Sequence, residues 1–323
     1  MTADLAFAPD DLITRVTRML TAAGADQRSA SLVAEGLVEA DARGLPSHGL
    51  LLLPMYLDRI RQGSVDPAGS NLILNDLGAL VTIDSRNGLG QASAQEAMEL
   101  AISRAREHGI AAANTRPLMP APGGAKAVVG NNPIAFAVPR TGQDPVIFDV
   151  ALSEAAMGKI RLAEAEGRSI PTTWATDAEG RPTDDPTAAI AGLLLPTGGA
   201  KGFGLALMVD MLTGVLSGGG FGDSVRGLYA DPRRPYNSST FFLAIDAGAL
   251  DPAFADRAAE LAAQVQASPM VSPDATARIP GERSAQNHRR SVREGIRLPR
   301  SVVEQIEHWE QQLELPGREE VTR

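Results

Sequence analysis

The stretch from Phe203 to Leu216 is strongly apolar, and it constrains the fold more than any other part of the chain. It predicts a helix, but the apolar run is too short to cross a membrane. A helix of this kind has to be buried in a globular core. The glycine-rich residues 197–202 precede it, and they predict a turn whose backbone amides, together with Lys201, could hold a phosphate or a carboxylate. The alternative is an ordinary turn before a buried helix.

Length and composition indicate a globular protein that handles small molecules. The 323 residues suffice for two domains of ordinary size or one large one. The 30 basic and 39 acidic residues give a net charge of −9, which argues against nucleic acid and membrane surfaces as partners. The absence of cysteine excludes disulfides and zinc–thiolate sites. The first residues are acidic and unlike a signal peptide, so we expect a cytoplasmic location.

The hydrophobic pattern predicts a helical N-terminal layer followed by mixed strands and helices. The layer has helices over residues 9–24, from the cap Asp26 to about Gly44, and over residues 50–63. Further strands are expected at 72–74, 80–83, 110–113, 134–138, 146–150 and 240–245, and further helices at 91–108, 153–166, 252–266, 284–293 and 301–313. We expect the strands at 134–138 and 146–150 to be buried. Ser153 is the expected cap of the next helix, and residues 116–124 should be irregular.

One of the four histidines, His48, follows Ser47 in a turn bounded by proline and glycine, just beyond a helix. Histidine can give or take a proton near neutral pH, and Ser47 could orient the ring. The pattern predicts a proton-transfer site, with a simple helix break as the alternative. The other histidines predict a helix cap and two polar helix faces but no metal site: His108, His288 and His308.

Several other positions carry candidate chemistry. Asp149 ends a predicted strand, where its carboxylate needs a partner such as a ribose hydroxyl or a backbone turn. Residues 280–283 combine a tight turn with two opposite charges. Residues 88–93 only approach a dinucleotide fingerprint, and a turn before a helix is expected there. A function that needs a lysine amine or a compact positive charge has three candidate residues: Lys126, Lys159 and Lys201.

Seven stretches in register resemble the type-2 malate/L-lactate dehydrogenase family, which includes ureidoglycolate and sulfolactate dehydrogenases and cyclic-imine reductases. They are ARGLPSHG with Tyr56 and Gly63 following, NGLGQ, GNNPIAFAVP, FDVALSEAAMGKI, DAEGRPTDDP, GGAKGFGLALMVDMLTGVLSG and PGERSA. The resemblance covers nearly the whole chain. It implies an α/β fold of the non-Rossmann malate/L-lactate dehydrogenase type, in which helices flank a mixed sheet beside a helical N-terminal layer.

The resemblance also implies an enzyme that uses NAD or NADP, acts on a small-molecule substrate and forms a homodimer. His48 looks like the proton donor and acceptor for the substrate, with Ser47 supporting it. Matching position by position implies a cofactor site lined by Asp149, Val150, Ala151, Ala200, Lys201, Pro280, Gly281 and Glu282. The implied reaction is hydride transfer between nicotinamide and a 2-hydroxy or 2-oxo acid of the malate, lactate or ureidoglycolate type. Reduction of an imine is a further possibility.

The chain departs from the family pattern beside the histidine. Family members usually carry an arginine four residues after it, where a guanidinium can hold a substrate carboxylate. This chain has Leu52 there. Lys159 is therefore our candidate anchor for the substrate, and Lys201 and Arg43 are the alternatives.

A larger departure lies between residues 112 and 120, where the family has a further strand, helix and strand with a second active-site histidine. Roughly 30 residues are absent here. The chain could be a shortened enzyme, or a weakened or inactive relative that keeps the dimer scaffold and the cofactor site. We expect a helical domain over residues 1–75, on which residues 284–323 pack back. A cofactor-binding domain over residues 76–283 would be shortened near 113–120.

Overall fold

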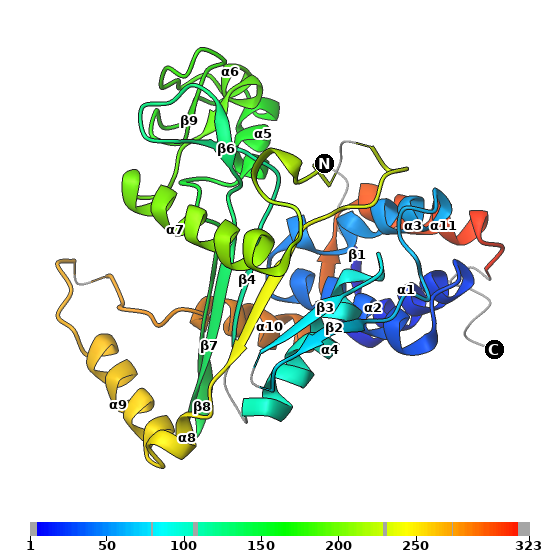
Figure 1. The fold of residues 1–323 in the computed structure, drawn as a ribbon, viewed down its shortest axis with the longest axis horizontal. Helices are drawn as coiled ribbons and strands as arrows, with labels where there is room; N and C mark the ends of the chain where they lie inside the picture. Colours follow the sequence, from blue (N-terminus) through cyan, green and yellow to red (C-terminus); the bar gives the residue numbers. More distant parts are fainter. Residues whose placement is uncertain (1–4, 79, 106–108, 229–230, 273, 316–323) are drawn as a thin grey trace.

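The computed structural model describes residues 5–78, 80–105, 109–228, 231–272 and 274–315. A helical layer lies on one side of a four-stranded sheet, and a smaller lobe stands at one end of that sheet (Figure 1). The helices are α1 (Pro9–Ala22), α2 (Gln27–Ala42), α3 (Leu53–Arg61), α4 (Gly90–Ala105), α5 (Met157–Ala165), α6 (Pro186–Ala191), α7 (Ala200–Asp210), α8 (Ala247–Leu250), α9 (Phe254–Gln266), α10 (Glu282–Glu294) and α11 (Arg300–Gln312). Shorter helical turns are η1 (Pro46–His48), η2 (Leu50–Leu52), the π-helical η3 (Met211–Val215) and η4 (Gly222–Ser224).

The strands form one larger sheet and four pairs. They are β1 (Leu5–Phe7), β2 (Leu72–Asp76), β3 (Val81–Asp84), β4 (Gly109–Ala113), β5 (Met119–Pro120), β6 (Ala127–Val129), β7 (Ile134–Arg140), β8 (Gln143–Val150), β9 (Ala175–Thr176), β10 (Leu193–Leu194), β11 (Thr240–Ala244) and β12 (Ile296–Leu298). The pairs are β1–β12, β2–β3, β5–β6 and β9–β10. Each strand predicted from the apolar runs is present, within a few residues of the expected bounds.

The helical layer closes around one hydrophobic core. Asp26 accepts hydrogen bonds from the amides of Arg28 and Ser29 and so caps α2, as predicted. Strands β1 and β12 pair antiparallel and bring the C-terminal part of the chain back to the layer. The core contains side chains from α1, α2, η2, α3, α4, β1, β12 and α11, among them Leu12, Leu37, Leu53, Leu298 and Ile306.

The larger sheet has the order β11–β4–β7–β8, and each neighbouring pair is antiparallel. The α/β fold class is confirmed, but the expected mixture of parallel and antiparallel pairs is not found among the described strands. Parallel neighbours need a crossover connection, and the chain passes from β4 directly toward β5. Because β4 and β8 both pair antiparallel with β7, they run in the same direction. Their carboxyl ends therefore meet at one edge of the sheet.

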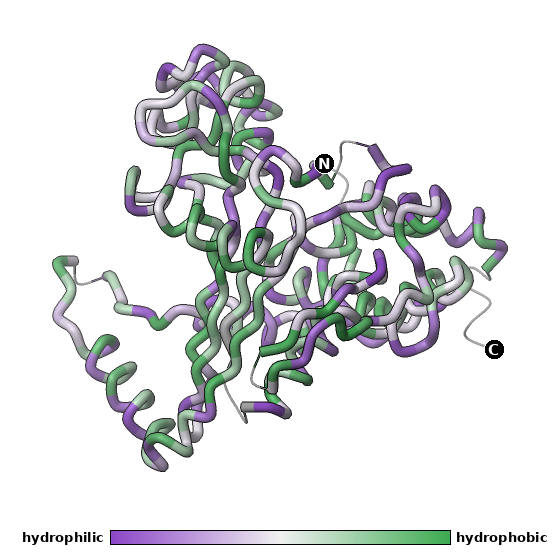
Figure 2. Tube along the Cα trace, viewed as in Figure 1, coloured by the Kyte–Doolittle hydropathy of each residue, from purple (hydrophilic) through white to green (hydrophobic). Residues whose placement is uncertain are grey.

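The strands β7 and β8 are less buried than predicted. Phe136 and Phe148 are 37% and 38% exposed, and their ring centroids lie 5.6 Å apart. Hydrophobic stretches run along both strands in Figure 2. No element among the described residues covers these side chains fully, so the expectation of buried strands is corrected.

The apolar helix predicted at residues 203–216 is also only partly buried. It forms as α7 followed by η3, and Ala206 and Val209 pack into a second core with Ala112, Met119 and Ile160. Several large apolar side chains on the same segment are exposed, namely Leu205, Leu207, Met208, Met211, Val215 and Leu216. One side of this segment therefore packs into the protein and the other faces outward.

Three smaller expectations change. Ser153 does not cap α5, which begins at Met157 after Ala156; its hydroxyl instead donates to the carbonyl of Ala155. The passage 116–124 includes the short strand β5, and His108 lies outside the described residues. Within the described ranges, no helix is long and apolar enough to span a bilayer.

Candidate active site

The Ser47–His48 turn forms η1, between the end of α2 and the start of α3. The Ser47 hydroxyl lies 3.0 Å from Nδ1 of His48, and both side chains are exposed. Within the described residues, no hydrogen bond or ion pair engages Nε2 of His48. One ring nitrogen is thus oriented by serine, and the other is available to a substrate.

The carboxylate of Asp41 lies beneath this turn. Its Oδ2 accepts a hydrogen bond of 2.7 Å from the backbone amide of Leu50. A side chain at Gly49 would overlap the Asp41 carboxylate, so the close packing requires glycine there. Burial raises the pKa of Asp41 to about 6, and the hydrogen bond from Leu50 only partly opposes this effect. Sequence reasoning missed Asp41; its signal was an acid within one helical turn of the predicted end of α2.

Helix α10 holds the C-terminal end of α2 against the sheet. Asn287 donates to the carbonyl of Arg43 at 3.2 Å, and Ser291 donates to the carbonyl of Ala42 at 2.9 Å. These carbonyls belong to the last turn of α2, where no later amide of the helix can donate to them. Since α10 begins at Glu282, its contacts connect the predicted cofactor residues to the backbone that carries Ser47 and His48.

The start of α10 packs directly on β8. The amide of Ile147 donates to the carbonyl of Pro280 at 3.1 Å. Gly281 has a φ of +90°, and a Cβ there would lie 3.0 Å from the Cβ of Ile147. Asp149 follows Ile147 by two positions, so their side chains point to the same face of the sheet. The structure thus brings Pro280, Gly281 and Glu282 beside the strand that ends in Asp149 and Val150 and is followed by Ala151.

The glycine-rich turn meets the end of the same strand. The amide of Thr197 donates to the carbonyl of Leu152 at 3.0 Å. Gly198 and Gly199 then adopt left-handed conformations, with φ of 60° and 65°, and α7 begins at Ala200. Ala200 and Lys201 are exposed at the first turn of α7, where the backbone amides have no helical acceptors. All three predicted cofactor segments are therefore placed along β8.

The residues along β8 fit a nicotinamide dinucleotide. The space around the α-carbons of Gly198 and Gly199 is open, which lets a phosphate approach the amides that begin α7. Asp149 is exposed, and no described residue bonds to its carboxylate, so its oxygens can accept hydrogen bonds from ribose hydroxyls. The amides that begin α7 can donate to the phosphates of such a cofactor, and the Asp149 carboxylate can accept from its ribose hydroxyls.

The predicted substrate anchors have different surroundings. Arg43 is engaged: its guanidinium donates to Glu39 at 2.6 Å and to Ser284 at 3.4 Å, so this alternative is not supported. Lys159, at the start of α5, is exposed and unpaired among the described residues. No hydrogen bond or ion pair connects it to the Ser47–His48 turn. Leu52, which stands where the family has arginine, packs against the helical core.

A second residue that sequence reasoning missed is Arg116, which follows β4 and is exposed. The neighbouring Thr115 is held by two asparagines: its amide donates to Oδ1 of Asn132, and its hydroxyl donates to Oδ1 of Asn131, both at 2.9 Å. Asn132 is fully buried and donates to the carbonyl of Ala206. The paired asparagines in the GNNP stretch were the available sequence signal.

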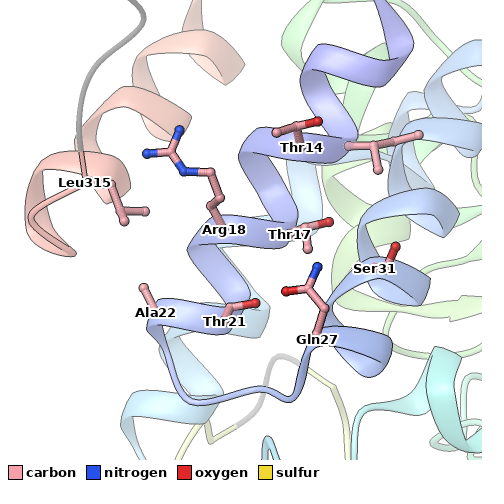
Figure 3. Close-up of a pocket in the computed structure, with 9 residues that line it drawn as sticks. Thr14, Thr17, Arg18, Thr21, Ala22, Gln27, Ser31 and Leu315 are labelled. Atoms are coloured by element: carbon pink, nitrogen blue, oxygen red, sulfur yellow. The ribbon is translucent and has the colours of Figure 1, made fainter. Parts of the chain in front are cut away.

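A cavity of about 510 Å³ lies far from these residues, between α1, the start of α2 and Leu315. Thr14, Arg18, Gln27 and Ser31 are among the side chains around it (Figure 3). Gln27 and Ser31 lie in the first turns of α2, whereas the Ser47–His48 turn follows its other end. The helix rises by about 16 Å between Ser31 and its last residue, Ala42, so the cavity is not part of the candidate site.

The chain matches the sequence profile of the family described as "Malate/L-lactate dehydrogenase" over residues 7–116 and 110–307. The two matches overlap on β4 and the residues after it. A chain that lacks a segment at this place would give such a double match, because one strand then aligns with both sides of the gap. The overlap supports the predicted loss of a segment near residues 113–120.

Similar proteins include several characterised enzymes. A (2R)-3-sulfolactate dehydrogenase (NADP(+)) from Chromohalobacter salexigens is 35% identical, over 91% of this chain and 94% of the relative. A ureidoglycolate dehydrogenase (NAD(+)) from Escherichia coli K12 is 35% identical over 67% of this chain and 70% of its own length. The solved structure of sulfolactate dehydrogenase from Methanocaldococcus jannaschii aligns with a TM-score of 0.90 and 28% identity, covering 96% of this chain and 98% of that one.

These similarities confirm the predicted class of enzyme, an NAD- or NADP-dependent oxidoreductase acting on small hydroxy acids. They also confirm the predicted fold type. With a profile match over most of its length and relatives at 35% identity, the chain belongs to the malate/L-lactate dehydrogenase family.

Proposed function

We propose that His48 is the general acid and base for the interconversion of a small 2-hydroxy acid and its 2-oxo form. The observation that carries this proposal is the Ser47–His48 contact. Helix α10 bonds to the end of α2 just before this turn, and the start of α10 packs on β8. When Nδ1 donates to Ser47, Nε2 carries the lone pair that accepts the substrate hydroxyl proton. In the reverse direction, the protonated Nε2 returns that proton to the carbonyl oxygen.

The cofactor would lie along β8. When bound, NAD or NADP supplies or accepts the hydride, and the protein provides binding and orientation. We infer that Asp149 accepts hydrogen bonds from a ribose, with Val150 and Ala151 lining the same position. Lys201 and the amides from Ala200 onward would hold a phosphate. Pro280, Gly281 and Glu282 would line the site beside Ile147, on the face of the strand that Asp149 shares.

Lys159 is the proposed anchor for the substrate carboxylate. Its support is that its amine is exposed and unpaired among the described residues, whereas Arg43 is held by Glu39 and Lys126 pairs with Asp223 at 3.1 Å. A lysine ammonium interacts with a carboxylate as a point charge. This would partly replace the arginine that the family places at the position of Leu52.

The proposal is tested by replacing His48 with alanine. Loss of a general acid and base lowers turnover by about 10²- to 10⁴-fold, so kcat should fall by that factor with malate, lactate or ureidoglycolate. The affinity for NADH or NADPH, measured by fluorescence titration, should change by less than about threefold, since His48 is not among the proposed cofactor residues. His308→Ala is the matched control, because His308 is exposed and its ring bonds, among the described residues, only to Gln312 in its own helix. Equal kcat in the two variants would refute the role of His48.

A second candidate function is a catalytically weakened scaffold that still binds the cofactor. The double profile match over residues 110–116 favours it, because the missing segment would carry the family's second histidine. NADH binding without turnover of malate, lactate, ureidoglycolate, sulfolactate or a cyclic imine would support this function. Turnover that His48→Ala abolishes would exclude it.

We also propose that the protein is a cytoplasmic homodimer. The support for a dimer is the outward apolar side of α7 and η3, where Met211 and Leu216 are 54% and 59% exposed. Contiguous exposed apolar side chains are typical of protein interfaces. A chain without cysteine needs no oxidising compartment for its fold, which is consistent with a location in the cytoplasm.

A further inference from the structure

An unpaired guanidinium stands where the chain lacks the family's crossover segment. Arg116 is exposed, and none of the described residues forms a hydrogen bond or ion pair with its side chain. Other exposed arginines have carboxylate partners, as Arg104 has in Asp76 and Arg289 in Asp144. The donors of Arg116 are therefore free to hold a carboxylate or a sulfonate in a bidentate geometry.

The backbone on both sides of Arg116 is fixed. The amide of Thr115 bonds to Asn132 at 2.9 Å, and the amide of Leu118 bonds to the carbonyl of Val129 at the same distance. Pro117 restricts the conformation of the residue before it. The side chain thus extends from a held segment, and ordering it on a ligand costs less entropy than it would on a mobile loop.

Arg116 lies at the same edge of the sheet as the proposed cofactor site. Strands β4 and β8 run in the same direction, and Asn131 joins the residues that follow them. Its carbonyl accepts from the amide of Leu152 at 2.7 Å, and its side-chain oxygen accepts from the hydroxyl of Thr115 at 2.9 Å. Arg116 is adjacent to Thr115, and Ala151 is adjacent to Leu152. One asparagine therefore separates the guanidinium-bearing segment from the cofactor strand.

We propose that Arg116 binds the second acidic group of a dianionic 2-hydroxy acid, a carboxylate or sulfonate at the carbon next to the reacting one. This assignment rests on the proposed function, in which Lys159 holds the first carboxylate. Arg116 would make the enzyme prefer malate-like and sulfolactate-like substrates over lactate, because lactate has no second anion to pair with the guanidinium.

The test is steady-state kinetics of Arg116→Gln with malate, sulfolactate and lactate at saturating cofactor. Loss of a charge-assisted hydrogen-bond pair should raise KM for malate and sulfolactate by about 10- to 100-fold. KM for lactate and the affinity for NADH should change by less than about threefold. Arg116→Lys should restore part of the preference. Arg161→Gln is the matched control, since Arg161 is also exposed and unpaired among the described residues.

Three outcomes would overturn the assignment: an unchanged KM for malate, an equal loss with malate and lactate, or the same effect in Arg161→Gln. If the unaltered protein turns over none of these acids, the proposed function fails, but Arg116 can still be tested. Calorimetric titration of malate and lactate into the NADH-loaded protein then decides: tighter malate binding that is lost in Arg116→Gln supports the assignment. Malate binding that is equal in both proteins refutes it.

Discussion

Asp41 supports the Ser47–His48 turn with a carboxylate that folding partly removes from water. The unfolded chain exposes this group, whose pKa is then near the ordinary value of about 3.9. In the folded protein, burial raises the pKa of Asp41 to about 6. Below about pH 4 the carboxyl is protonated in both states, and folding has no ionisation cost there. The cost develops between pH 4 and 6 and is complete above pH 6.

Asp41→Asn should therefore raise the free energy of unfolding above pH 6. The amide oxygen can still accept from Leu50, while the charge is removed. A shift of this size corresponds to about 1–2 kcal/mol once solvent screening of a half-buried group is allowed for. Chemical denaturation at pH 8 should show this gain, and the gain should shrink toward zero as the pH falls to 4. A difference that does not depend on pH would mean that ionisation of Asp41 is not its cause.

At the scale of elements, the junction of β8 and α10 places the cofactor residues, and Gly281 is its tightest point. Gly281→Ala adds both a left-handed strain and a contact with Ile147. The matched control is Gly142→Ala in the β7–β8 hairpin, where φ is +68° but a Cβ would meet nothing. We expect Gly142→Ala to destabilise folding by about 1 kcal/mol, and Gly281→Ala by about 1–3 kcal/mol more.

The affinity for NADH separates the two variants further. Gly281→Ala should weaken cofactor binding because it moves α10 away from β8, whereas Gly142→Ala should leave the affinity unchanged. Thermal unfolding and fluorescence titration of both variants test this pair of expectations. Equal effects of the two substitutions would show that only backbone strain matters and that the close packing on Ile147 does not.

Local sequence signals predicted most elements because they depend on spacing and caps within a few residues. The cap Asp26 and the strands β2 and β3 are examples. Features that depend on distant partners were not accessible. Ser153 does not cap α5, because its hydroxyl donates to the carbonyl of Ala155. The position of the Ser47–His48 turn depends on hydrogen bonds from Asn287 and Ser291, some 240 residues away in the sequence.

The motifs named candidate cofactor residues that lie beside or just after β8, and their role in binding the cofactor stays a prediction. The motifs did not reveal Asp41 or Arg116. Asp41 stands out because it is partly buried, and Arg116 because no described residue pairs with it. Both properties depend on the folded surroundings. The prediction from apolar runs also overestimated the burial of β7, β8 and α7, since an apolar surface can face either a core or another molecule. The division of the chain near residue 75 stays a prediction.

At the scale of the whole molecule, the apolar side of α7 and η3 predicts that a second copy covers it. Met211→Glu places a charge within this surface, and desolvating an unpaired charge in an interface is costly. We expect the unaltered protein to be a dimer at micromolar concentration and Met211→Glu to be a monomer, by size-exclusion chromatography with light scattering. Leu250→Glu is the control, because Leu250 is an 81% exposed apolar residue on α8, outside this surface. Circular dichroism should show that both variants stay folded. A monomeric unaltered protein, or dissociation by Leu250→Glu alone, would contradict the predicted interface.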